Sequence, residues 1–461
     1  MDRIEAAVAE RDQRLHFVGL AGSGMSALAQ YRVLQGGRAS GSDRCFDQGE
    51  QEPVRAGLGS LGIGITPQDG SGVAGAAGVI SSTAVEREIP DLIRARKLGL
   101  PIWHRAELLA EHLRGASLAV AGTSGKSTVV AMVFEILREA GEDPGLITGA
   151  RLRSLMGGHL LGNAWSGKGP LVAEADESDG SLVHHHPEAS IILNLHRDHM
   201  ETEQVMEQFR LFKRQTRGPV VVSDDPNLRP LWKGAALFGT SRHARYRATG
   251  LWSERDGCGF RLEDVRFRLP MPGLYNASNG LAATAICHSV GIDLATAREA
   301  LARFGGVHRR FELIGQARGV EVVDDFAHNP VKLAAVLTLA KSRSQRVLAL
   351  FQPHGFAPTR FQRHELLEMF AATLRPEDRL WIAPIFFAGG TVCRDISSAD
   401  LVRELAGLGA PALPVPDRER WPGEVAALAE RGDTVLVLGA RDPSLPALAR
   451  EVLETIRSGL P

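Results

Sequence analysis

The chain has 461 residues, enough for about three domains of roughly 150 residues each. Its formal net charge is −1, which excludes the basic excess typical of proteins that bind nucleic acid or a membrane surface. The four cysteines are far apart and form no CxxC pair, and no apolar stretch reaches about 18 residues, so we expect a cytoplasmic protein without a zinc-finger site, disulfides, signal peptide or membrane span.

The first segment, residues 1–112, alternates predicted strands and helices. An apolar strand at 15–18 is followed by a glycine-rich turn and by a helix that has Met25 and Leu28 on one face. A second strand follows the helix, and residues 79–83 form another. This order is typical of a Rossmann-like domain.

The second segment, residues 113–313, begins with a strand at 117–122 and a helix with Val130, Val133 and Leu137 at helical spacing. Further apolar strands are predicted at 170–176, 190–195 and 219–224. Short strands between about 235 and 270 predict a small antiparallel part. A helix after the stretch PGLYNASNG completes the segment.

The third segment, residues 314–461, is predicted to be an open parallel sheet with helices on both faces. Its four predicted strands are 320–326, 346–352, 378–385 and 433–440. The fold class is therefore α/β with three domains: an N-terminal Rossmann-like domain, a central P-loop ATPase-type domain with a small antiparallel part, and a C-terminal Rossmann-like domain.

The stretch GTSGKST at 122–128 lies between the strand and the helix that open the second segment. Backbone N–H groups in such a turn, together with the helix dipole, bind phosphate. Lys126 matches the lysine that contacts the β- and γ-phosphates, and Ser127 matches the hydroxyl that binds Mg²⁺. Val120 stands where the common motif has glycine, which indicates a shortened loop. A chance match is the alternative.

Acidic residues and a histidine follow two other strands of the same segment. VAEADESD contains Glu174, Asp176, Glu177 and Asp179, and NLHRDHM contains His199. An acidic turn is often only solvated, and an isolated histidine is often structural. Because the carboxyl ends of parallel strands meet at one edge of a sheet, we expect these side chains to supply Mg²⁺ ligands near the phosphate loop.

The turn GLAGSG at 19–24 and Asp43 resemble a dinucleotide fingerprint with an acid for the ribose. The glycine spacing differs from that fingerprint, so the pattern predicts a nucleotide diphosphate without specifying which. Asn276 and Asn279 begin a helix, where they either cap it or pair with an adenine edge. Arg309 and Arg310 are either solvated or placed to neutralise a transferring phosphoryl group.

Considered together, these motifs resemble those of the Mur ligase family. GTSGKST, EADESD, NLHRDHM, GLYNASNG, HRRFE, DDFAHNP and FQPH occur in the family's order and approximate spacing. The first segment, with GLAGSGMS and GSD, is also similar to the family's first domain, so the resemblance covers essentially the whole chain. The branch that adds L-alanine is the most similar.

The resemblance implies an ATP-dependent amide ligase of peptidoglycan precursor synthesis. ATP would activate a carboxylate as an acyl phosphate, and an amine would then attack it. The implied partners are ATP, Mg²⁺, a UDP-sugar of the UDP-N-acetylmuramate type and an amino acid or small peptide, with no nucleic acid or membrane. We expect a monomer or a homodimer.

The family's roles carry over residue by residue. The residues matched to catalysis are Lys126, His199, Arg310 and His328. Those matched to ATP are Gly122, Thr123, Ser124, Gly125, Lys126, Ser127, Thr128, Asn276, Asn279, Arg310 and Asp325. Those matched to the metal are Ser127, Glu174 and His199. Those matched to the UDP-sugar or the amino acid are Gly19, Gly22, Gly24, Ser42, Asp43, Ser82, His354 and Arg360.

The sequence departs from the alanine-adding branch after FQPH. That branch typically has arginines where this chain has Gly355 and Pro358, and those arginines are placed to bind the amino acid's carboxylate. Arg360 is the nearest possible substitute. The ending GARDPSL and Ser124, Ser127, Tyr275 and Asn329 also differ from that branch.

Three other hypotheses remain. A Mur-type ligase could take another acid or amine, such as a preformed murein peptide, which the change at Gly355 favours. An NAD-dependent oxidoreductase would use GLAGSG and Asp43 but leaves GTSGKST and EADESD unexplained. A nucleotide-binding protein without turnover is disfavoured because Lys126, Glu174 and His199 are all present.

Overall fold

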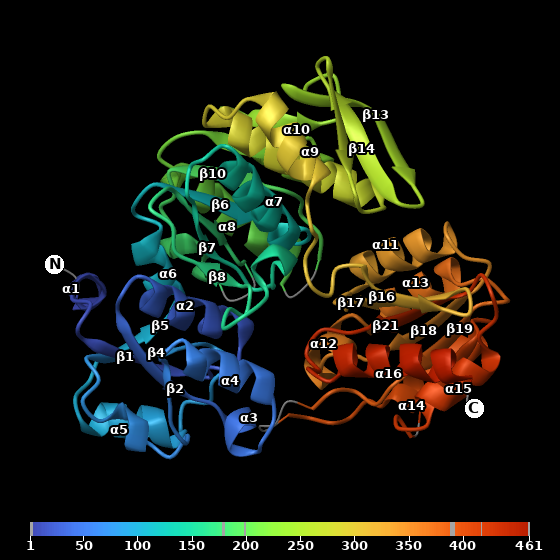
Figure 1. Ribbon diagram of the computed structural model, residues 1–461, viewed down its shortest axis with the longest axis horizontal. Coiled ribbons are helices and arrows are strands. Elements are labelled where there is room, and N and C mark those ends of the chain that lie inside the picture. The colour runs from blue at the N-terminus through green and yellow to red at the C-terminus, as the bar shows by residue number, and fades with distance from the viewer. Residues whose placement is uncertain (1–2, 178–179, 198–199, 388–391, 416, 460–461) are drawn as a thin grey trace. The chain divides into compact units, whose positions relative to one another are not determined.

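The computed structural model describes residues 3–177, 180–197, 200–387, 392–415 and 417–459 (Figure 1). The chain divides into two compact units, Met1–Val307 and His308–Pro461, and each is described by itself. None of the helices in the described ranges is long and apolar enough to cross a membrane.

The first part of unit 1 is a parallel five-stranded sheet with the strand order β3-β2-β1-β4-β5. Its strands are β1 (Arg14–Val18), β2 (Arg38–Ser42), β3 (Gly64–Ile65), β4 (Gly78–Ser81) and β5 (Ile102–His104). Its helices are α1 (Arg3–Ala9), α2 (Ser23–Leu34), α3 (Arg44–Asp47), α4 (Glu52–Ser60), η1 (Ser71–Val73), α5 (Pro90–Lys97) and α6 (Arg105–His112). The predicted Rossmann-like arrangement is confirmed.

The second part of unit 1 is a ten-stranded sheet with the order β15-β14-β13-β12-β11-β10-β6-β9-β7-β8. Its strands are β6 (Ser117–Ala121), β7 (Gly145–Ile147), β8 (Ala164–Trp165), β9 (Leu171–Glu174), β10 (Ala189–Ile192), β11 (Val220–Ser223), β12 (Ala236–Gly239), β13 (Tyr246–Glu254), β14 (Gly257–Leu262) and β15 (Val265–Leu269). Its helices are α7 (Lys126–Glu139), η2 (Arg153–Leu155), η3 (Ser181–His184), α8 (Thr202–Gln215), η4 (Pro226–Leu231), α9 (Leu274–Ser289) and α10 (Leu294–Ala302).

The antiparallel part of this sheet is smaller than the sequence predicted. Residues 236–239 form β12, which is parallel to both of its neighbours. Antiparallel pairing starts between β13 and β14 and continues to β15, so this part extends the main sheet at one edge. Figure 1 shows β13 and β14 as long arrows beside α9 and α10.

Unit 2 is a six-stranded sheet with the order β16-β17-β21-β18-β19-β20. Its strands are β16 (Glu312–Ala317), β17 (Val320–Asp325), β18 (Val347–Phe351), β19 (Arg379–Ile382), β20 (Ala412–Pro414) and β21 (Thr434–Leu438). Its helices are α11 (Pro330–Lys341), α12 (Phe356–Phe361), α13 (Arg363–Thr373), α14 (Ser398–Gly407), α15 (Trp421–Leu428) and α16 (Leu445–Ser458). The four predicted strands are confirmed, and two edge strands, β16 and β20, were not predicted.

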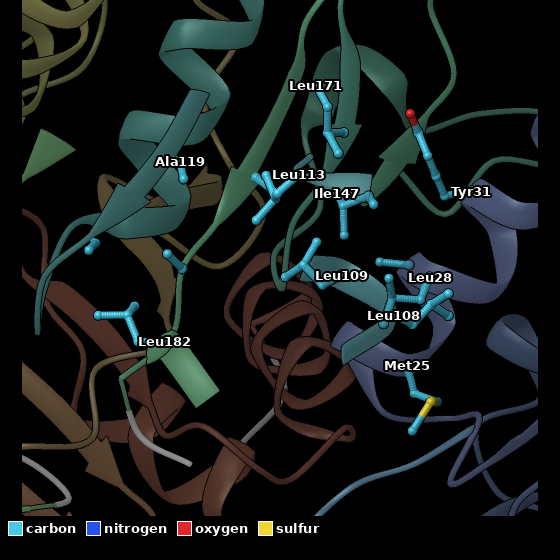
Figure 2. Packing of buried hydrophobic residues seen from close by; sticks show 14 of the residues in the cluster. Met25, Leu28, Tyr31, Leu108, Leu109, Leu113, Ala119, Ile147, Leu171 and Leu182 are labelled. Atoms are coloured by element: carbon cyan, nitrogen blue, oxygen red, sulfur yellow. The ribbon is translucent and has the colours of Figure 1, made fainter. Parts of the chain in front are cut away.

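The two sheets of unit 1 share one hydrophobic core. Met25 and Leu28 of α2 and Leu109 of α6 belong to the same buried cluster as Ile147 and Leu171 of the second sheet. Figure 2 shows these side chains gathered between the elements that carry them. Burial of such apolar side chains contributes about 1.5–3 kcal/mol each, so the shared cluster holds the two parts together in one compact unit.

A buried polar link accompanies this core. The Gln30 side chain on α2 donates to Asn163 Oδ1 at 2.7 Å, and Asn163 Nδ2 donates to the Ser23 carbonyl at 2.8 Å. Because a buried amide without partners is costly, these bonds fix the start of α2 against the second sheet.

His112, at the end of α6, packs edge-on against Tyr31 of α2, with 5.0 Å between ring centroids. Its Nε2 atom is shielded from solvent and finds no hydrogen-bond partner among the described residues. Burial lowers the pKa of His112 to about 4, and the nearby charge of Arg32 acts in the same direction. The folded chain therefore holds this imidazole neutral at pH values where an unfolded chain has begun to protonate it.

We predict that acid weakens unit 1 through His112. The pKa of His112 is about 4 in the folded chain and 6.5 for an unperturbed histidine. Above pH 6.5 the imidazole is neutral in both states and does not affect stability. Between pH 6.5 and 4 the unfolded chain binds a proton that the folded chain does not, so the free energy of unfolding falls by about 1.4 kcal/mol per pH unit. The variant His112→Phe keeps a ring against Tyr31 without titrating. Urea unfolding at pH 7, 5.5 and 4 should show a smaller loss for this variant. An equal loss in both proteins would contradict the assignment.

Candidate active site

The phosphate loop joins β6 to α7 and takes its shape from two glycines. Gly122 and Gly125 have φ angles of +137° and +86°, values that side chains other than glycine rarely adopt. A methyl group on Gly122 would lie 2.9 Å from Leu193 Cβ, and one on Gly125 would lie 2.7 Å from Asn279 Oδ1. The loop therefore needs glycine at both positions, for conformation and for space.

Asn194, in the loop after β10, holds the phosphate loop in place. Its Oδ1 accepts from Thr123 Oγ1 at 2.9 Å and from the Ser124 N–H at 2.8 Å. Its Nδ2 donates to the Ser124 carbonyl at 3.0 Å. The three bonds fix the backbone just before the first turn of α7, whose N–H groups have no partner within the helix and so are available to a phosphate.

Lys126, at the start of α7, is surrounded by oxygen atoms. Its Nζ donates to the Gly122 carbonyl at 2.7 Å and to Glu177 Oε2 at 2.6 Å, and lies 3.5 Å from Asp176 Oδ1. Burial disfavours the charged amine, but the carboxylates of Glu177 and Asp176 outweigh it and hold the pKa of Lys126 above its ordinary value. The side chain is therefore a largely buried cation, with 14% of its surface exposed.

Glu174 ends β9 and faces a pocket of about 450 Å³. Its Oε1 accepts a hydrogen bond from Thr148 Oγ1. The pocket extends from the glycine-rich turn after β1 to this carboxylate and to Asp176. Its volume is typical of small-molecule sites.

Several residues predicted to bind a substrate line this pocket. They are Gly19, Gly22, Gly24, Asp43 and Ser82. The Asp43 carboxylate accepts from the backbone N–H groups of Ala21 and Cys45, at 2.8 and 2.9 Å, so it also fixes the shape of the turn.

Ser42 is placed differently from the prediction. Its hydroxyl is fully buried and donates to Asp91 Oδ1 at 3.1 Å, and it does not line the pocket. Its carbonyl accepts from the N–H groups of Gly19 and Leu20. Ser42 therefore supports the glycine-rich turn from inside the fold.

The predicted metal ligands are only partly placed. Ser127 is in the first turn of α7 and Glu174 faces the pocket, and both offer the oxygen ligands that Mg²⁺ prefers. His199 lies outside the described residues. Within the described residues, no three His, Cys, Asp or Glu side chains come together as a ready metal site.

Both asparagines of α9 lie near its start. Asn276 is buried, and its Nδ2 donates to the Pro272 carbonyl at 2.7 Å, which makes it part of the helix entry. Asn279 Oδ1 lies beside Gly125, so its side chain contacts the phosphate loop.

In unit 2 the two neighbouring arginines have different environments. Arg309, with φ +58°, turns inward, where its Nε lies 3.0 Å from the fully buried Asp324 and its Nη2 donates to the Gly439 carbonyl at 2.7 Å. Arg310 stacks over the Phe326 ring, 4.9 Å from its centroid. Arg309 is therefore structural, and the choice of Arg310 for a ligand-binding role stays a prediction.

Loops at the carboxyl ends of β17 and β18 bring other predicted residues together. The rings of His328 and His354 meet edge to face, 4.6 Å between centroids. Asp325 is buried, and its two carboxylate oxygens accept the backbone N–H groups of Phe311 and Ala327. Burial raises the pKa of Asp325, and the charge of Arg310 opposes that rise.

Arg360 does not have a free guanidinium. Its Nη2 donates to Asp395 Oδ1 at 2.5 Å and to the Cys393 carbonyl at 3.2 Å. The pKa of Asp395 is lowered mainly by the hydrogen bond from this arginine. An incoming carboxylate would have to displace Asp395.

Four residues at this site were not predicted from the sequence. Thr148, Arg105 and His185 line the pocket, and Asn194 fixes the phosphate loop. Arg105 also lies 3.8 Å from Asp176. Asn194 lies near the end of the predicted strand 190–195, but its contacts with Thr123 and Ser124 could not be predicted from the sequence.

Unit 1 carries a phosphate loop, an acidic strand end and a glycine-rich turn on two α/β sheets, and unit 2 adds a third sheet. This combination is typical of a multidomain enzyme that uses a nucleotide. The chain belongs to the Mur ligase family. Family models match residues 14–117 (Mur ligase family, catalytic domain), 120–287 (Mur ligase middle domain) and 309–441 (Mur ligase, glutamate ligase domain). This membership confirms the predicted ligase class and removes the oxidoreductase hypothesis.

Relatives of this chain include proteins named UDP-N-acetylmuramate–L-alanine ligase. That of Symbiobacterium thermophilum is 34% identical over 97% of this chain and 95% of its own length. That of Renibacterium salmoninarum is 35% identical over 97% of this chain and 98% of its own length.

Solved structures agree with these relatives. The UDP-N-acetylmuramate–alanine ligase of Thermotoga maritima has a TM-score of 0.80 at 28% identity, over 96% of this chain and 99% of that one. A murein peptide ligase of Psychrobacter arcticus has a TM-score of 0.69 at 22% identity, over 96% of this chain and 99% of that one, and shows the fold alone.

We predict that Asn194→Ala weakens ATP binding about tenfold. The change removes three hydrogen bonds and leaves the Ser124 N–H without its acceptor, so the loop loses its preformed shape. Isothermal titration of ATP measures the effect. Asn227→Ala is the matched control, because Asn227 donates to the Leu195 carbonyl outside the phosphate loop. An unchanged Kd for Asn194→Ala would contradict the prediction.

Proposed function

We propose that the chain uses ATP to join the carboxylate of UDP-N-acetylmuramate to L-alanine in peptidoglycan precursor synthesis, in the cytoplasm. The relatives named above support the two substrates. The single structural observation that carries the proposal is that residues 174–177 connect the phosphate loop with the neighbouring pocket. Glu177 contacts Lys126 of the phosphate loop, while Glu174 and Asp176 line the neighbouring pocket.

This arrangement suits transfer of a phosphoryl group to a carboxylate. A carboxylate is a poor electrophile at neutral pH, and phosphorylation gives it a good leaving group. Attack of the carboxylate oxygen on the γ-phosphorus forms an acyl phosphate and releases ADP. The amine then adds to the acyl carbon, and the tetrahedral intermediate loses phosphate and a proton to leave the amide.

Lys126 is the residue that would stabilise charge on the transferring group. The negatively charged oxygens of a bound triphosphate would compete with Glu177 for the ammonium group of Lys126. The first-turn N–H groups of α7 add fixed donors that need no reorganisation.

Mg²⁺ belongs to this proposal as well. Ser127, Glu174 and His199 would hold it. When bound, the ion offsets negative charge on the phosphate oxygens. The oxygen atoms of Ser127 and Glu174 fit such a hard cation.

The remaining assignments rest on the family resemblance. The residues that would contact ATP are Gly122, Thr123, Ser124, Gly125, Thr128, Asn276, Asn279 and Asp325. Arg310 would contact the phosphates of ATP, and His328 would lie near the reacting atoms. Gly19, Gly22, Gly24, Asp43 and Ser82 would contact the UDP-sugar. Their position on the wall of one pocket supports this last set.

A phosphate-release assay tests the function. The purified protein is incubated with ATP, Mg²⁺, UDP-N-acetylmuramate and each member of a panel of amino acids. We expect release that requires all components and is fastest with L-alanine. The absence of release with every amine would reject the proposal.

We predict that Lys126→Ala lowers kcat by at least about a hundredfold, since one preorganised charge contact is worth several kcal/mol in such a transition state. The protein should still bind UDP-N-acetylmuramate, because Lys126 does not line the pocket. Lys168→Ala, which removes an exposed lysine of the same unit, is the control. Turnover of Lys126→Ala within a few fold of the original would reject the role.

A second candidate function is the addition of a preformed peptide. Gly355 and Pro358 replace the arginines of the alanine-adding branch, which favours a different amine. A relative from Neisseria meningitides, named UDP-N-acetylmuramate:L-alanyl-gamma-D-glutamyl-meso-diaminopimelate ligase, is 26% identical over 65% of this chain and 100% of its own. A preference for peptides over L-alanine in the same assay would select this function.

A further inference from the structure

Arg441, in the loop between β21 and α16, lies beside Gly355. A methyl group on Gly355 would be 3.5 Å from its Nη1 atom. The side chain is exposed and makes no hydrogen bond or ion pair with any residue in the described ranges. An arginine stays charged at every pH at which proteins are folded, so this is an available guanidinium.

The loop of Arg441 is central to the carboxyl edge of the unit 2 sheet. β21 lies between β17 and β18, and all three strands are parallel. The loop after β17 carries His328, and the loop after β18 carries His354 and Gly355. In open α/β sheets, ligands bind at the carboxyl ends of the strands.

Several other arginines of unit 2 have acidic partners. Arg309 binds Asp324, Arg360 binds Asp395, and Arg418 binds Asp442. A free carboxylate would have to displace a protein carboxylate from each of them. Arg441 presents no such competition among the described residues.

Gly355 cannot supply the positive charge of the arginine that the alanine-adding branch has at this position. Gly355 has φ +148°, a conformation that disfavours any side chain, and the space in front of it faces Arg441. The backbone conformation therefore favours glycine at 355, and the guanidinium of Arg441 lies close to the position that a side chain there would occupy.

We propose that Arg441 binds the carboxylate of the incoming amine substrate, in place of the arginines that Gly355 and Pro358 replace. This inference rests on the proposed ligase function and deepens it. A planar guanidinium can donate two parallel hydrogen bonds to one carboxylate. The substrate class is therefore an amine that carries a free carboxylate, and amines without one are poor substrates.

The test compares L-alanine with L-alaninamide, which lacks the carboxylate, in the full chain and in Arg441→Ala. We expect the variant to raise the KM for L-alanine about tenfold to hundredfold, the effect of losing a charge-assisted pair of hydrogen bonds. The KM values for ATP and UDP-N-acetylmuramate should not change, and the weak reaction with L-alaninamide should be equal in both proteins. Arg441→Lys should recover part of the loss.

Arg450→Ala is the matched control, because Arg450 is an exposed arginine on α16. Its KM values should equal those of the original chain. Thermal unfolding verifies that each variant is folded, and Arg441→Gln replaces Arg441→Ala should the latter unfold. If a peptide proves to be the preferred amine, the peptide and its amidated form take the place of alanine and alaninamide.

Two results would overturn the assignment of Arg441 while leaving the ligase function intact. One is phosphate release with an unchanged KM for the amine in Arg441→Ala. The other is an increase in KM that occurs in Arg360→Ala and not in Arg441→Ala. A lack of release from the original chain with every amine overturns the ligase function itself, and this inference with it.

Discussion

The buried ion pair between Lys126 and Glu177 connects the two halves of the candidate active site. Lys126 begins the helix that follows the phosphate loop, and Glu177 follows the strand whose last residue, Glu174, borders the pocket. Loss of one partner from a buried pair leaves an uncompensated charge, at a cost of about 3–5 kcal/mol. The pair therefore fixes the acidic stretch and keeps a cation beside it before any nucleotide arrives.

Local sequence patterns predicted the parts of the site that depend on neighbours in the chain. The phosphate loop was predicted because an apolar strand, a glycine-containing turn and an apolar helical face occur within a few residues. The parallel order of strands then brought Glu174 to the same edge. The edge strand β20, only three residues long, and the more polar β16 were missed because such strands carry little periodic pattern.

Long-range contacts decided what the sequence could not predict. Asn194 binds the phosphate loop 70 residues earlier in the sequence. No local pattern distinguishes an asparagine that fixes a distant loop from any other polar residue at the end of a strand. Arg309 and Arg310 are the same residue type, so their roles could not be distinguished from the sequence. The Arg309 side chain turns inward because its backbone has a positive φ and because it pairs with the buried Asp324. The pairing of Gly355 with Arg441 likewise joins two loops far apart in sequence that the sheet order brings together.

The shared core of the first two sheets determines where the chain can be divided. A fragment that began near residue 113 would carry Ile147 and Leu171 on its surface without their partners on α2 and α6, and Asn163 would lose both Gln30 and Ser23. Such a fragment would present an apolar face to water and be prone to aggregate. The phosphate loop and the glycine-rich pocket therefore belong to one compact unit, and the boundary near residue 307 is where the chain can be cut without opening this shared core.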